Sequence, residues 1–464
     1  MRQLEADILG MANVFKAYDV RGVYPDEINK ELSFKIGGAT VEFLKANLPA
    51  GRQGTLVVGE DCRLSSPTMR GAVIDAATRA GAKVYYIGAC TTPLFYFSVD
   101  KLKADGGTMV TASHNPPQYG GLKIVGSQSR PIGSESGLKE IEKISQGEIQ
   151  PARDMGKVEE VNLTDDYIDF VIQKSGIRSE KLKNLRIVVD AGNGMTPLVL
   201  GPLFEKIGIK PSLLYFDVDC SFPNHSPDIS KAEALADLKR KVLETRADIG
   251  IAFDGDGDRA SFLDKNGNKI GAEFILALLF KSESGFFRKP KTVYDLRASK
   301  SVKELLGGAG IRSRVGHAPI KELMRKHNAV LGGELSGHFF FKEMGYAESS
   351  MLAMLKVLKI ISESNKSLDE LIKPFQKYFH SGEVNMPIDN NEQGKIIIQK
   401  LKEKYKDGKV DELDGVTVEY VDWWFNLRLS NTEPIIRLVV EADTEVMMEE
   451  KRNELLKVIK NPLS

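Results

Sequence analysis

Three aspartates alternate with glycines in the segment DGDGDR at residues 254–259. The segment follows the apolar run IGIAF, so the carboxylates of Asp254, Asp256 and Asp258 are expected where a buried strand ends. Carboxylates held this close repel one another, and burying them uncompensated is costly. Mg²⁺ prefers hard oxygen ligands and keeps waters or phosphate oxygens in its remaining positions. The segment therefore predicts a magnesium site, with a polar surface turn as the alternative.

Two other kinds of aspartate-rich site fit this segment poorly. A calcium-binding EF-hand loop beginning at Asp254 would have Gly at position 259 and Glu at position 265, where the chain has Arg259 and Lys265. A phosphatase of the haloacid dehalogenase type would carry Thr or Val in place of Asp258. Magnesium is therefore the preferred interpretation.

The segment TASHNPPQYGGLK at residues 111–123 places Ser113 just after GGTMV, an apolar strand-like run. In open α/β sheets, ligands collect beyond the carboxyl ends of the strands. A serine hydroxyl is a weak nucleophile unless a base or metal assists it, and His114 and Lys123 are close in sequence. Ser113 is therefore a candidate nucleophile. A structural role as a turn or helix cap stays open, because Ser, Asn and Pro all favour turns.

A glycine-flanked loop, GGELSGH, presents Glu334, Ser336 and His338 at alternate positions. A glutamate there could hydrogen-bond two neighbouring hydroxyls of a sugar. His317 and Lys321 precede the loop and stand four residues apart, which would place them on one helical face. For either histidine, a structural role is an open alternative.

The segment RLSNTEPIIR at residues 428–437 combines Arg428 with the short polar side chains of Ser430, Asn431 and Thr432. An arginine fork and the N–H groups of a tight loop together suit a phosphate group. The chain has no Walker loop and no G-x-G-x-x-G element, so nucleotide binding by those routes is disfavoured. A hairpin turn with an exposed arginine is the alternative.

These motifs need elements to position them, and apolar runs that end in polar loops recur through the first three quarters of the chain. Helical patterns lie between the runs, such as SSPTMRGAVIDAATRAG, with a serine cap, an early proline and Gly81 as a stop. The alternation predicts α/β domains with parallel or mixed sheets. After about residue 376, alternating strands and an amphipathic helix predict a smaller α+β domain. The expected domains are 1–157, 158–266, 267–376 and 377–464.

Composition narrows the class of protein. Of 464 residues, 64 are Lys or Arg and 64 are Asp or Glu. The chain therefore lacks the surplus of basic residues that is typical of nucleic-acid-binding proteins. No run approaches the roughly 20 apolar residues of a membrane helix, and the acidic start does not resemble a signal peptide. The three cysteines, Cys62, Cys90 and Cys220, show no paired spacing, which argues against disulfides and zinc. A soluble protein of the reducing cytoplasm is expected.

The motifs TASHNP, DGDGDR, GELSGH and RLSNTEP, in this order and spacing, resemble those of the α-D-phosphohexomutase family, in particular its bacterial phosphomannomutase/phosphoglucomutase branch. The resemblance covers almost the whole chain, including FKAYDVRG at residues 15–22. It implies three similar α/β domains and a C-terminal α+β domain around a central cleft. It also implies Mg²⁺ held by the three aspartates and contacting a phosphorylated Ser113.

The resemblance implies a role for each remaining candidate. Proton transfer would involve Lys123 and His338 first, then Arg21 and His114. Residues implied to bind the substrate are Tyr18, Arg259, His317, Lys321, Glu334, Ser336, Arg428, Ser430, Asn431, Thr432 and Arg437.

The implied reaction converts hexose 1-phosphate to hexose 6-phosphate, of mannose or glucose, through a bound hexose 1,6-bisphosphate. Glucose 1,6-bisphosphate would act as activator, and the protein would be a monomer or weak homo-oligomer. A glucosamine phosphate mutase, a silent sugar-phosphate sensor and a simple phosphatase are the alternatives. The chain departs from the family at 344–354, where MGYAESSMLAM replaces a paired-acid and glycine element; Glu348 and Ser349 could still cap the next helix. The first ten residues extend beyond the family's usual start, so Met11 is a possible initiator.

Overall fold

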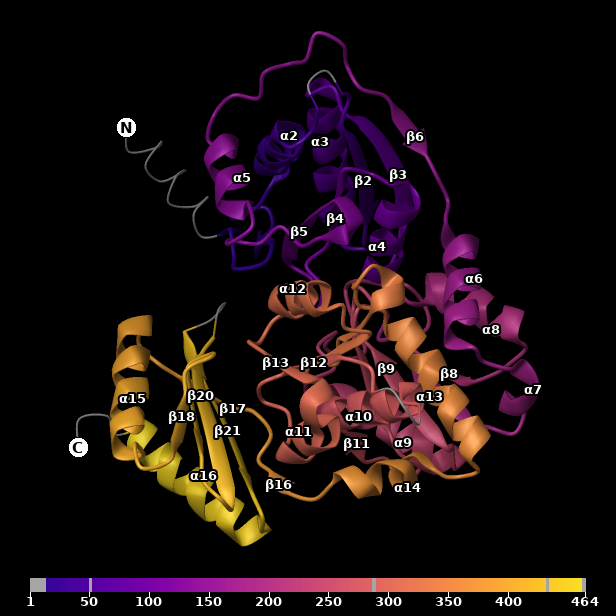
Figure 1. Cartoon of the computed structure of the whole chain (residues 1–464). Coiled ribbons are helices and arrows are strands. Elements are labelled where there is room, and N and C mark those ends of the chain that lie inside the picture. Colours follow the sequence, from indigo (N-terminus) through magenta and orange to yellow (C-terminus); the bar gives the residue numbers. More distant parts are fainter. Residues whose placement is uncertain (1–13, 50–51, 286–288, 431–433, 461–464) are drawn as a thin grey trace. The chain divides into compact units, whose positions relative to one another are not determined.

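The computed structural model describes residues 14–49, 52–285, 289–430 and 434–460. The chain divides into two compact units, and Figure 1 labels helices and strands of both. Unit 1 contains residues 1–272 and 336–368, and unit 2 contains residues 273–335 and 369–464. The expected alternative start at Met11 lies outside the described residues. Among the helices of the described ranges, none is both long and apolar enough to cross a membrane.

The first sheet of unit 1 is mixed and has the strand order β1-β5-β4-β2-β3-β6. Its central strands β4, β2 and β3 run parallel, and β5 is antiparallel to both β4 and β1. The strands are β1 (Val20–Val23), β2 (Thr55–Glu60), β3 (Lys83–Ala89), β4 (Gly106–Val110), β5 (Tyr119–Gly126) and β6 (Val158–Glu160). The helices are α2 (Lys30–Ala46), α3 (Ser66–Arg79), α4 (Thr92–Lys101) and α5 (Leu138–Ser145).

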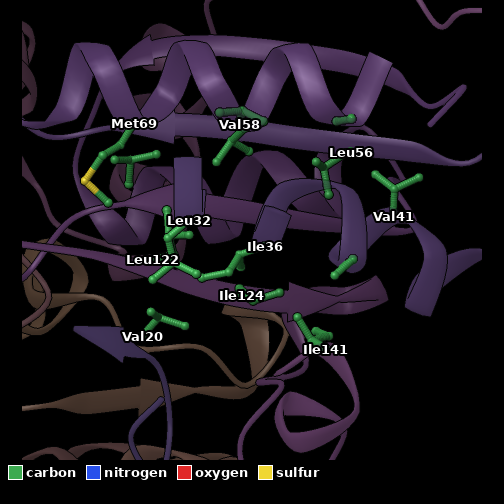
Figure 2. Close-up of a cluster of buried hydrophobic side chains, with 14 of the residues drawn as sticks. Val20, Leu32, Ile36, Val41, Leu56, Val58, Met69, Leu122, Ile124 and Ile141 are labelled. Atoms are coloured by element: carbon green, nitrogen blue, oxygen red, sulfur yellow. The ribbon is translucent and has the colours of Figure 1, made fainter. Parts of the chain in front are cut away.

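Side chains alternate across this sheet and build a core on each face. Leu56 and Val58 of β2 point to the cluster formed with α2, α3 and α5, which Figure 2 shows with Ile36 and Ile141. On the opposite face, Gly107 of β4 leaves room for α4, because a Cβ built there would lie 2.7 Å from the Phe95 ring. With both faces covered, the polar ends of β4 and β5 are the places where chemistry can be exposed.

The second sheet of unit 1 has the order β11-β10-β9-β7-β8. Strands β8, β7 and β9 are parallel, whereas β10 returns antiparallel to β9. The strands are β7 (Ile187–Asp190), β8 (Ser212–Leu214), β9 (Ile249–Phe253), β10 (Ala260–Leu263) and β11 (Lys269–Ile270). The helices are α6 (Thr164–Ser175), α7 (Ser179–Leu182), α8 (Pro197–Ile207) and α9 (Ala236–Thr245). The aspartate segment 254–259 is therefore the turn of the β9–β10 hairpin.

Residues 336–368 also belong to unit 1 and add β15 (Phe339–Phe341) and α13 (Ser350–Ser364). Ser349 caps α13, since its hydroxyl accepts a hydrogen bond from the Leu352 N–H at 3.2 Å. The cap expected in the departing segment is thus present at Ser349. The Ser349 hydroxyl also lies 2.8 Å from that of Tyr167 in α6.

Unit 2 contains a parallel group of strands and an antiparallel sheet. In the first group β12 lies between β13 and β14. Its elements are α10 (Ala272–Glu283), β12 (Thr292–Asp295), α11 (Lys300–Leu306), β13 (Gly310–Ser313), α12 (His317–His327) and β14 (Leu331–Gly333). The antiparallel sheet has the order β16-β21-β20-β19-β18, and β17 also pairs with β21. Its elements are α14 (Leu368–Ile372), β16 (Phe379–His380), β17 (Val384–Pro387), α15 (Asn391–Lys404), β18 (Lys409–Asp411), β19 (Val416–Glu419), β20 (Trp423–Leu429), β21 (Ile435–Ala442) and α16 (Glu445–Lys460).

The start and stop signals that the sequence predicts for helix α3 are present, with one difference at the N-cap. Pro67 stands in the first turn and Gly81 follows the helix with φ of +82°, a left-handed conformation that glycine adopts without steric cost. Ser65 occupies the N-cap position, but its side chain makes no capping hydrogen bond. Proline and glycine therefore mark this helix better than its serine does.

The prediction that the cysteines do not pair is wrong. Cys62, after β2, and Cys220, after β8, form a disulfide with their Cα atoms 5.4 Å apart, and Cys90 is free and buried. The two partners are 158 residues apart in sequence, so spacing carried no signal of their proximity. The expectation of a reducing compartment, which rested on unpaired cysteines, loses that support.

We expect Cys62→Ser to lower the melting temperature of the protein. A disulfide that closes so long a loop restricts the unfolded chain, and its loss typically costs about 2–4 kcal/mol of unfolding free energy. Differential scanning calorimetry with and without dithiothreitol measures the effect. The reductant should lower the melting temperature of the wild type but not of Cys62→Ser. An unchanged wild-type melting temperature, with all three thiols titratable after reduction, would contradict the prediction.

Candidate active site

Ser113 lies in the loop between β4 and β5 and is 1% exposed. Its φ of +52° is a left-handed conformation, which is strained for a residue other than glycine and persists only where its surroundings impose it. The Ser113 N–H donates to the Thr111 hydroxyl at 2.9 Å, and the Asn115 N–H donates to the Ala112 carbonyl at 3.0 Å. These bonds fix the loop, and the Ser113 hydroxyl with it.

His114 is the candidate base nearest to the serine, with its Nδ1 at 3.3 Å from the Ser113 hydroxyl. Burial, reinforced by the positive charges of Arg259 and Arg21, holds the pKa of His114 well below its usual value. The imidazole is therefore neutral near pH 7 and has a lone pair with which it can accept a proton.

Arg21, at the start of the first sheet, also contacts the serine loop. Its Nη1 donates to the Asn115 side chain at 2.5 Å and to the Ala112 carbonyl at 3.4 Å, while its Nε bonds Asp19 at 2.8 Å. Tyr18, another predicted site residue, is partly buried in the loop that precedes β1. The N-terminal motif and the serine motif thus adjoin in space, although more than 90 residues separate Arg21 from Asn115.

The aspartate hairpin lies directly against the serine loop. A Cβ built on Gly255 would be 2.8 Å from the Ser113 carbonyl oxygen, so only glycine permits this approach. Asp254, Asp256 and Asp258 are each at most 1% exposed, and one oxygen of each lies within 4.8 Å of the others. Aspartates spaced two residues apart in the sequence thus bring their carboxylates together at this turn.

Lys123 joins the two motifs. Its ammonium donates to Asp256 at 2.7 Å and to Asp258 at 2.5 Å. Burial opposes its charge, but the two carboxylates outweigh burial and raise the pKa of Lys123 above its usual value. Lys123 is therefore a fixed cation between the strand that follows the serine loop and the aspartate turn.

The charges of the aspartates are only partly compensated by the protein. Burial first, and then the charges of Asp258 and Asp256, raise the pKa of Asp254 well above its usual value. Asp254 Oδ2 and Asp256 Oδ1 are buried and accept no hydrogen bond from another described residue. Convergent buried carboxylate oxygens without donors are the ligand set that a divalent cation such as Mg²⁺ requires.

His338 and Arg259 close the unit 1 site. His338 Nε2 lies 3.2 Å from both Arg259 Nε and Asp258 Oδ1, and its Nδ1 lies 2.9 Å from the Ser336 hydroxyl. Arg259 also donates its backbone N–H to Asp254 at 3.0 Å. Five of the predicted positions are thus connected through His338 and Arg259.

A second cluster of predicted residues lies in unit 2, around Glu383. The Glu383 carboxylate accepts from Arg297 at 2.7 Å, from Arg428 at 2.9 Å and from Arg437 at 2.5 Å. Burial raises the pKa of Glu383, but the three guanidiniums outweigh it and hold the pKa below its usual value. Arg437 also lies 3.4 Å from the Ser430 hydroxyl. Glu383 holds the three guanidiniums together, and their remaining N–H groups can bind an anion.

Glu334 borders the same cluster within unit 2. It is 5% exposed, accepts the Gly316 N–H at 2.9 Å, and lies 4.0 Å from Arg297. His317 begins α12, and Lys321 lies one turn further on the same helix, as their spacing predicts. Asn431 and Thr432, predicted to bind phosphate, fall outside the described residues.

Sequence reasoning missed three residues that hold these clusters together: Arg63, Arg297 and Glu383. Arg63 and Arg297 both follow an aspartate by two positions just after a strand, in EDCR and YDLR. Each donates its Nε to that aspartate, Asp61 or Asp295. This shared pattern was a usable signal, whereas nothing in the sequence around Glu383 distinguishes it.

Models of the four phosphoglucomutase/phosphomannomutase domains match the chain in order. Alpha/beta/alpha domains I, II and III match residues 12–151, 165–267 and 266–378, and the C-terminal domain matches residues 383–458. The chain belongs to the phosphoglucomutase/phosphomannomutase family. This confirms the predicted family and fold class of three α/β domains and a C-terminal domain.

Individual members of the family resemble the chain over nearly its whole length. It is 38% identical to a phosphomannomutase of Methanocaldococcus jannaschii, covering 97% of this chain and 98% of that protein. It is 37% identical to a phosphomannomutase of Vibrio cholerae, covering 96% and 98%. A family crystal structure from Burkholderia thailandensis superposes with a TM-score of 0.84 at 28% identity, covering 97% and 98%. The chain is thus a phosphohexomutase, an isomerase that transfers a phosphoryl group intramolecularly.

Proposed function

We propose that the chain interconverts the 1- and 6-phosphates of mannose and glucose through a phosphoserine at Ser113. The observation that carries the proposal is the strained serine loop lying against a buried aspartate turn, with Lys123 bonded to two of the aspartates. This arrangement supplies a nucleophile and opposing charges in one water-poor site. The relatives named phosphomannomutase support mannose as one of the sugars.

Mg²⁺ would be held by Asp254, Asp256 and Asp258, with the phosphorylated Ser113 as a further ligand. When bound, the ion would offset the charge of the carboxylates and of the transferring phosphoryl group. The chain's own contribution is to keep these oxygens converged and shielded from water. Lys123, bonded to Asp256 and Asp258, neutralises part of the carboxylate charge. The proton transfer that the family resemblance implies for Lys123 would require it to release a proton that these two carboxylates hold in place.

Proton transfer at the reacting hydroxyl needs a group whose protonation state can change. The neutral His114 accepts the Ser113 proton when the serine attacks a phosphate, since it is 3.3 Å from the hydroxyl. His338, which lies beside Asp258, and Arg21, which bonds the serine loop, are assigned to proton transfer at the sugar hydroxyl of the substrate.

Recognition of the sugar and of its non-reacting phosphate is assigned mainly to unit 2. Arg428, Arg437 and Ser430, with Asn431 and Thr432, are assigned to the phosphate, and Glu334 and Ser336 are each assigned to sugar hydroxyls. His317, Lys321, Tyr18 and Arg259 complete the proposed contacts. A site that recognises hydroxyls and a phosphate, and not the shape of an apolar group, can bind a hexose 1,6-bisphosphate in both orientations. This bisphosphate is the proposed intermediate and activator. We assign the protein to the cytoplasm as a monomer or weak homo-oligomer.

A coupled assay tests this proposal. It follows hexose 6-phosphate formation from mannose 1-phosphate and glucose 1-phosphate, with Mg²⁺ and a trace of glucose 1,6-bisphosphate. Turnover of both sugars, dependent on Mg²⁺, is expected. Turnover of glucosamine 1-phosphate alone would show that the substrate is an amino sugar and not mannose or glucose. Stoichiometric release of inorganic phosphate would show that the protein hydrolyses the substrate and does not isomerise it.

We expect Arg428→Lys to raise KM for mannose 1-phosphate by roughly 10- to 100-fold. A lysine keeps the charge but cannot form two parallel hydrogen bonds to a phosphate, and a charge-assisted hydrogen bond contributes about 1.5–3 kcal/mol. Steady-state kinetics measure the change. Arg312→Lys is the matched control, because Arg312 pairs with Asp411 and Thr417 of the same unit, away from Glu383. Equal KM values for both variants would contradict the assignment.

A further inference from the structure

Arg63 is the largest of the fully buried side chains, at 1% exposure, although it is charged. It stands three residues after β2, in the loop that also carries Asp61 and Cys62. A charged group is buried at this depth only when it is paired and hydrogen-bonded, because the desolvation cost is otherwise too large. The partners of Arg63 therefore show what its burial serves.

All five N–H donors of the Arg63 guanidinium have acceptors. Its Nε donates to Asp61 at 3.1 Å. Its two terminal nitrogens donate to backbone carbonyls of the serine loop, at 2.7 Å to Ser113, 2.7 Å to Asn115 and 2.7 Å to Pro116, and to that of Tyr119, where the loop enters β5, at 3.1 Å. One planar fork thus fixes four carbonyls on a loop whose reactive residue has a strained φ of +52°.

The guanidinium is itself held from the other sides. Asp61 accepts the Arg63 N–H at 3.1 Å and the Ser66 hydroxyl at 2.5 Å, and the Asp61 N–H donates to Val110 at the end of β4 at 3.0 Å. The Phe222 ring lies 5.5 Å from the guanidinium carbon, and the Cys62–Cys220 disulfide joins the two loops that carry Arg63 and Phe222. The fork is therefore fixed relative to both sheets of unit 1.

We propose that Arg63 is a positioning residue for phosphoryl transfer, because it holds the Ser113 loop in a strained conformation whose backbone packs against Gly255 of the aspartate turn. This rests on the proposed role of Ser113 as phosphoryl carrier. Arg63 is bonded to the carbonyls of the loop and not to the serine hydroxyl, so it acts through the backbone. Lysine cannot replace it, since an ammonium has three donors in a different geometry.

The test compares Arg63→Lys and Arg63→Ala with Arg70→Lys. Arg70 is a matched control, since it pairs with Glu60 at 3.2 Å and lies 4.9 Å from the centre of an aromatic ring, that of Tyr86, yet has no bond to the serine loop. Misplacing a reacting group by about 1 Å can cost on the order of 10²-fold in rate. We expect Arg63→Lys to lower kcat by about that factor while KM for hexose 1-phosphate changes less than threefold. Arg70→Lys should keep both constants near wild type.

Two further measurements separate positioning from simple destabilisation. Guanidinium at millimolar concentration should restore part of the kcat of Arg63→Ala, and hydrogen exchange in both Arg63 variants should rise at residues 113–119 more than in the remainder of the first sheet. A kcat for Arg63→Lys within threefold of wild type would overturn the proposal. So would a loss fully explained by the unfolded fraction at the assay temperature. If wild-type protein isomerises no hexose phosphate, the proposed function fails instead, and hydrogen exchange alone decides whether Arg63 orders the loop.

Discussion

Replacing Ser113 by alanine is expected to lower kcat for hexose phosphate isomerisation by at least ~10⁴-fold, because it removes the hydroxyl proposed to carry the phosphoryl group. His114 lies 3.3 Å from the hydroxyl, and its burial and the nearby arginines keep it neutral, so in the wild type it can accept the serine proton. Coupled-assay kinetics measure the loss. Incubation with radiolabelled glucose 1,6-bisphosphate should label wild-type protein and leave Ser113→Ala unlabelled.

Ser129→Ala is a closely matched control for this experiment. Ser129 is also 1% exposed, also has a left-handed φ, of +54°, and donates its hydroxyl to the Tyr96 carbonyl at 2.8 Å in the same part of unit 1. Any general effect of removing a buried hydroxyl from a strained serine should appear in both variants. Full turnover by Ser113→Ala, or equal losses in the two variants, would exclude a phosphoserine at position 113.

The chemistry of the unit 1 site could be read from the sequence because each motif follows an apolar strand-like run. GGTMV and IGIAF are β4 and β9, buried strands of two different sheets, and Ser113 and Asp254 follow their ends. Periodicity and turn residues are local properties, and they carried the prediction this far. That Lys123 would bond Asp256 and Asp258 was not predictable locally, since more than 130 residues separate them.

The disulfide and the Glu383 cluster, which sequence reasoning missed, are both long-range features. The Cys62–Cys220 disulfide forms between loops from two different sheets, and the cysteine spacing holds no trace of that approach. Glu383 matters because three arginines from separate elements converge on it. Which side chains meet over such long separations depends on how whole sheets pack. That packing is determined by many apolar contacts and not by a short motif. The local patterns therefore indicated candidate reactive residues and did not indicate which residues hold them in place.

Replacing Asp254 by asparagine is expected to separate stability from activity. An asparagine keeps the acceptor for the Arg259 N–H, at 3.0 Å from Asp254 Oδ1, and puts an N–H₂ group in place of an oxygen that accepts no hydrogen bond from the described residues. Burial and the charges of Asp258 and Asp256, which raise the pKa of Asp254, then oppose folding less. Without Mg²⁺, the variant should melt at or above the wild-type temperature. Its kcat should nevertheless fall on the order of 10³-fold, because the loss of a metal ligand removes several kcal/mol of transition-state stabilisation.

Thermal melts with and without Mg²⁺ supply a readout independent of turnover. An ion that binds only the folded protein stabilises it by about 2.7 kcal/mol at 100 times its Kd, so the wild type should melt higher when Mg²⁺ is added and Asp254→Asn should not. Asp190→Asn is the control, since Asp190 is a fully buried carboxylate at the end of β7 in the same sheet and pairs with His225 at 3.2 Å. It should retain the Mg²⁺-induced shift. A shift that survives in Asp254→Asn would place the metal elsewhere, and no shift in the wild type would mean that the folded protein does not bind Mg²⁺. In either case the opposing charges at the aspartate turn would have to come from Lys123 and Arg259.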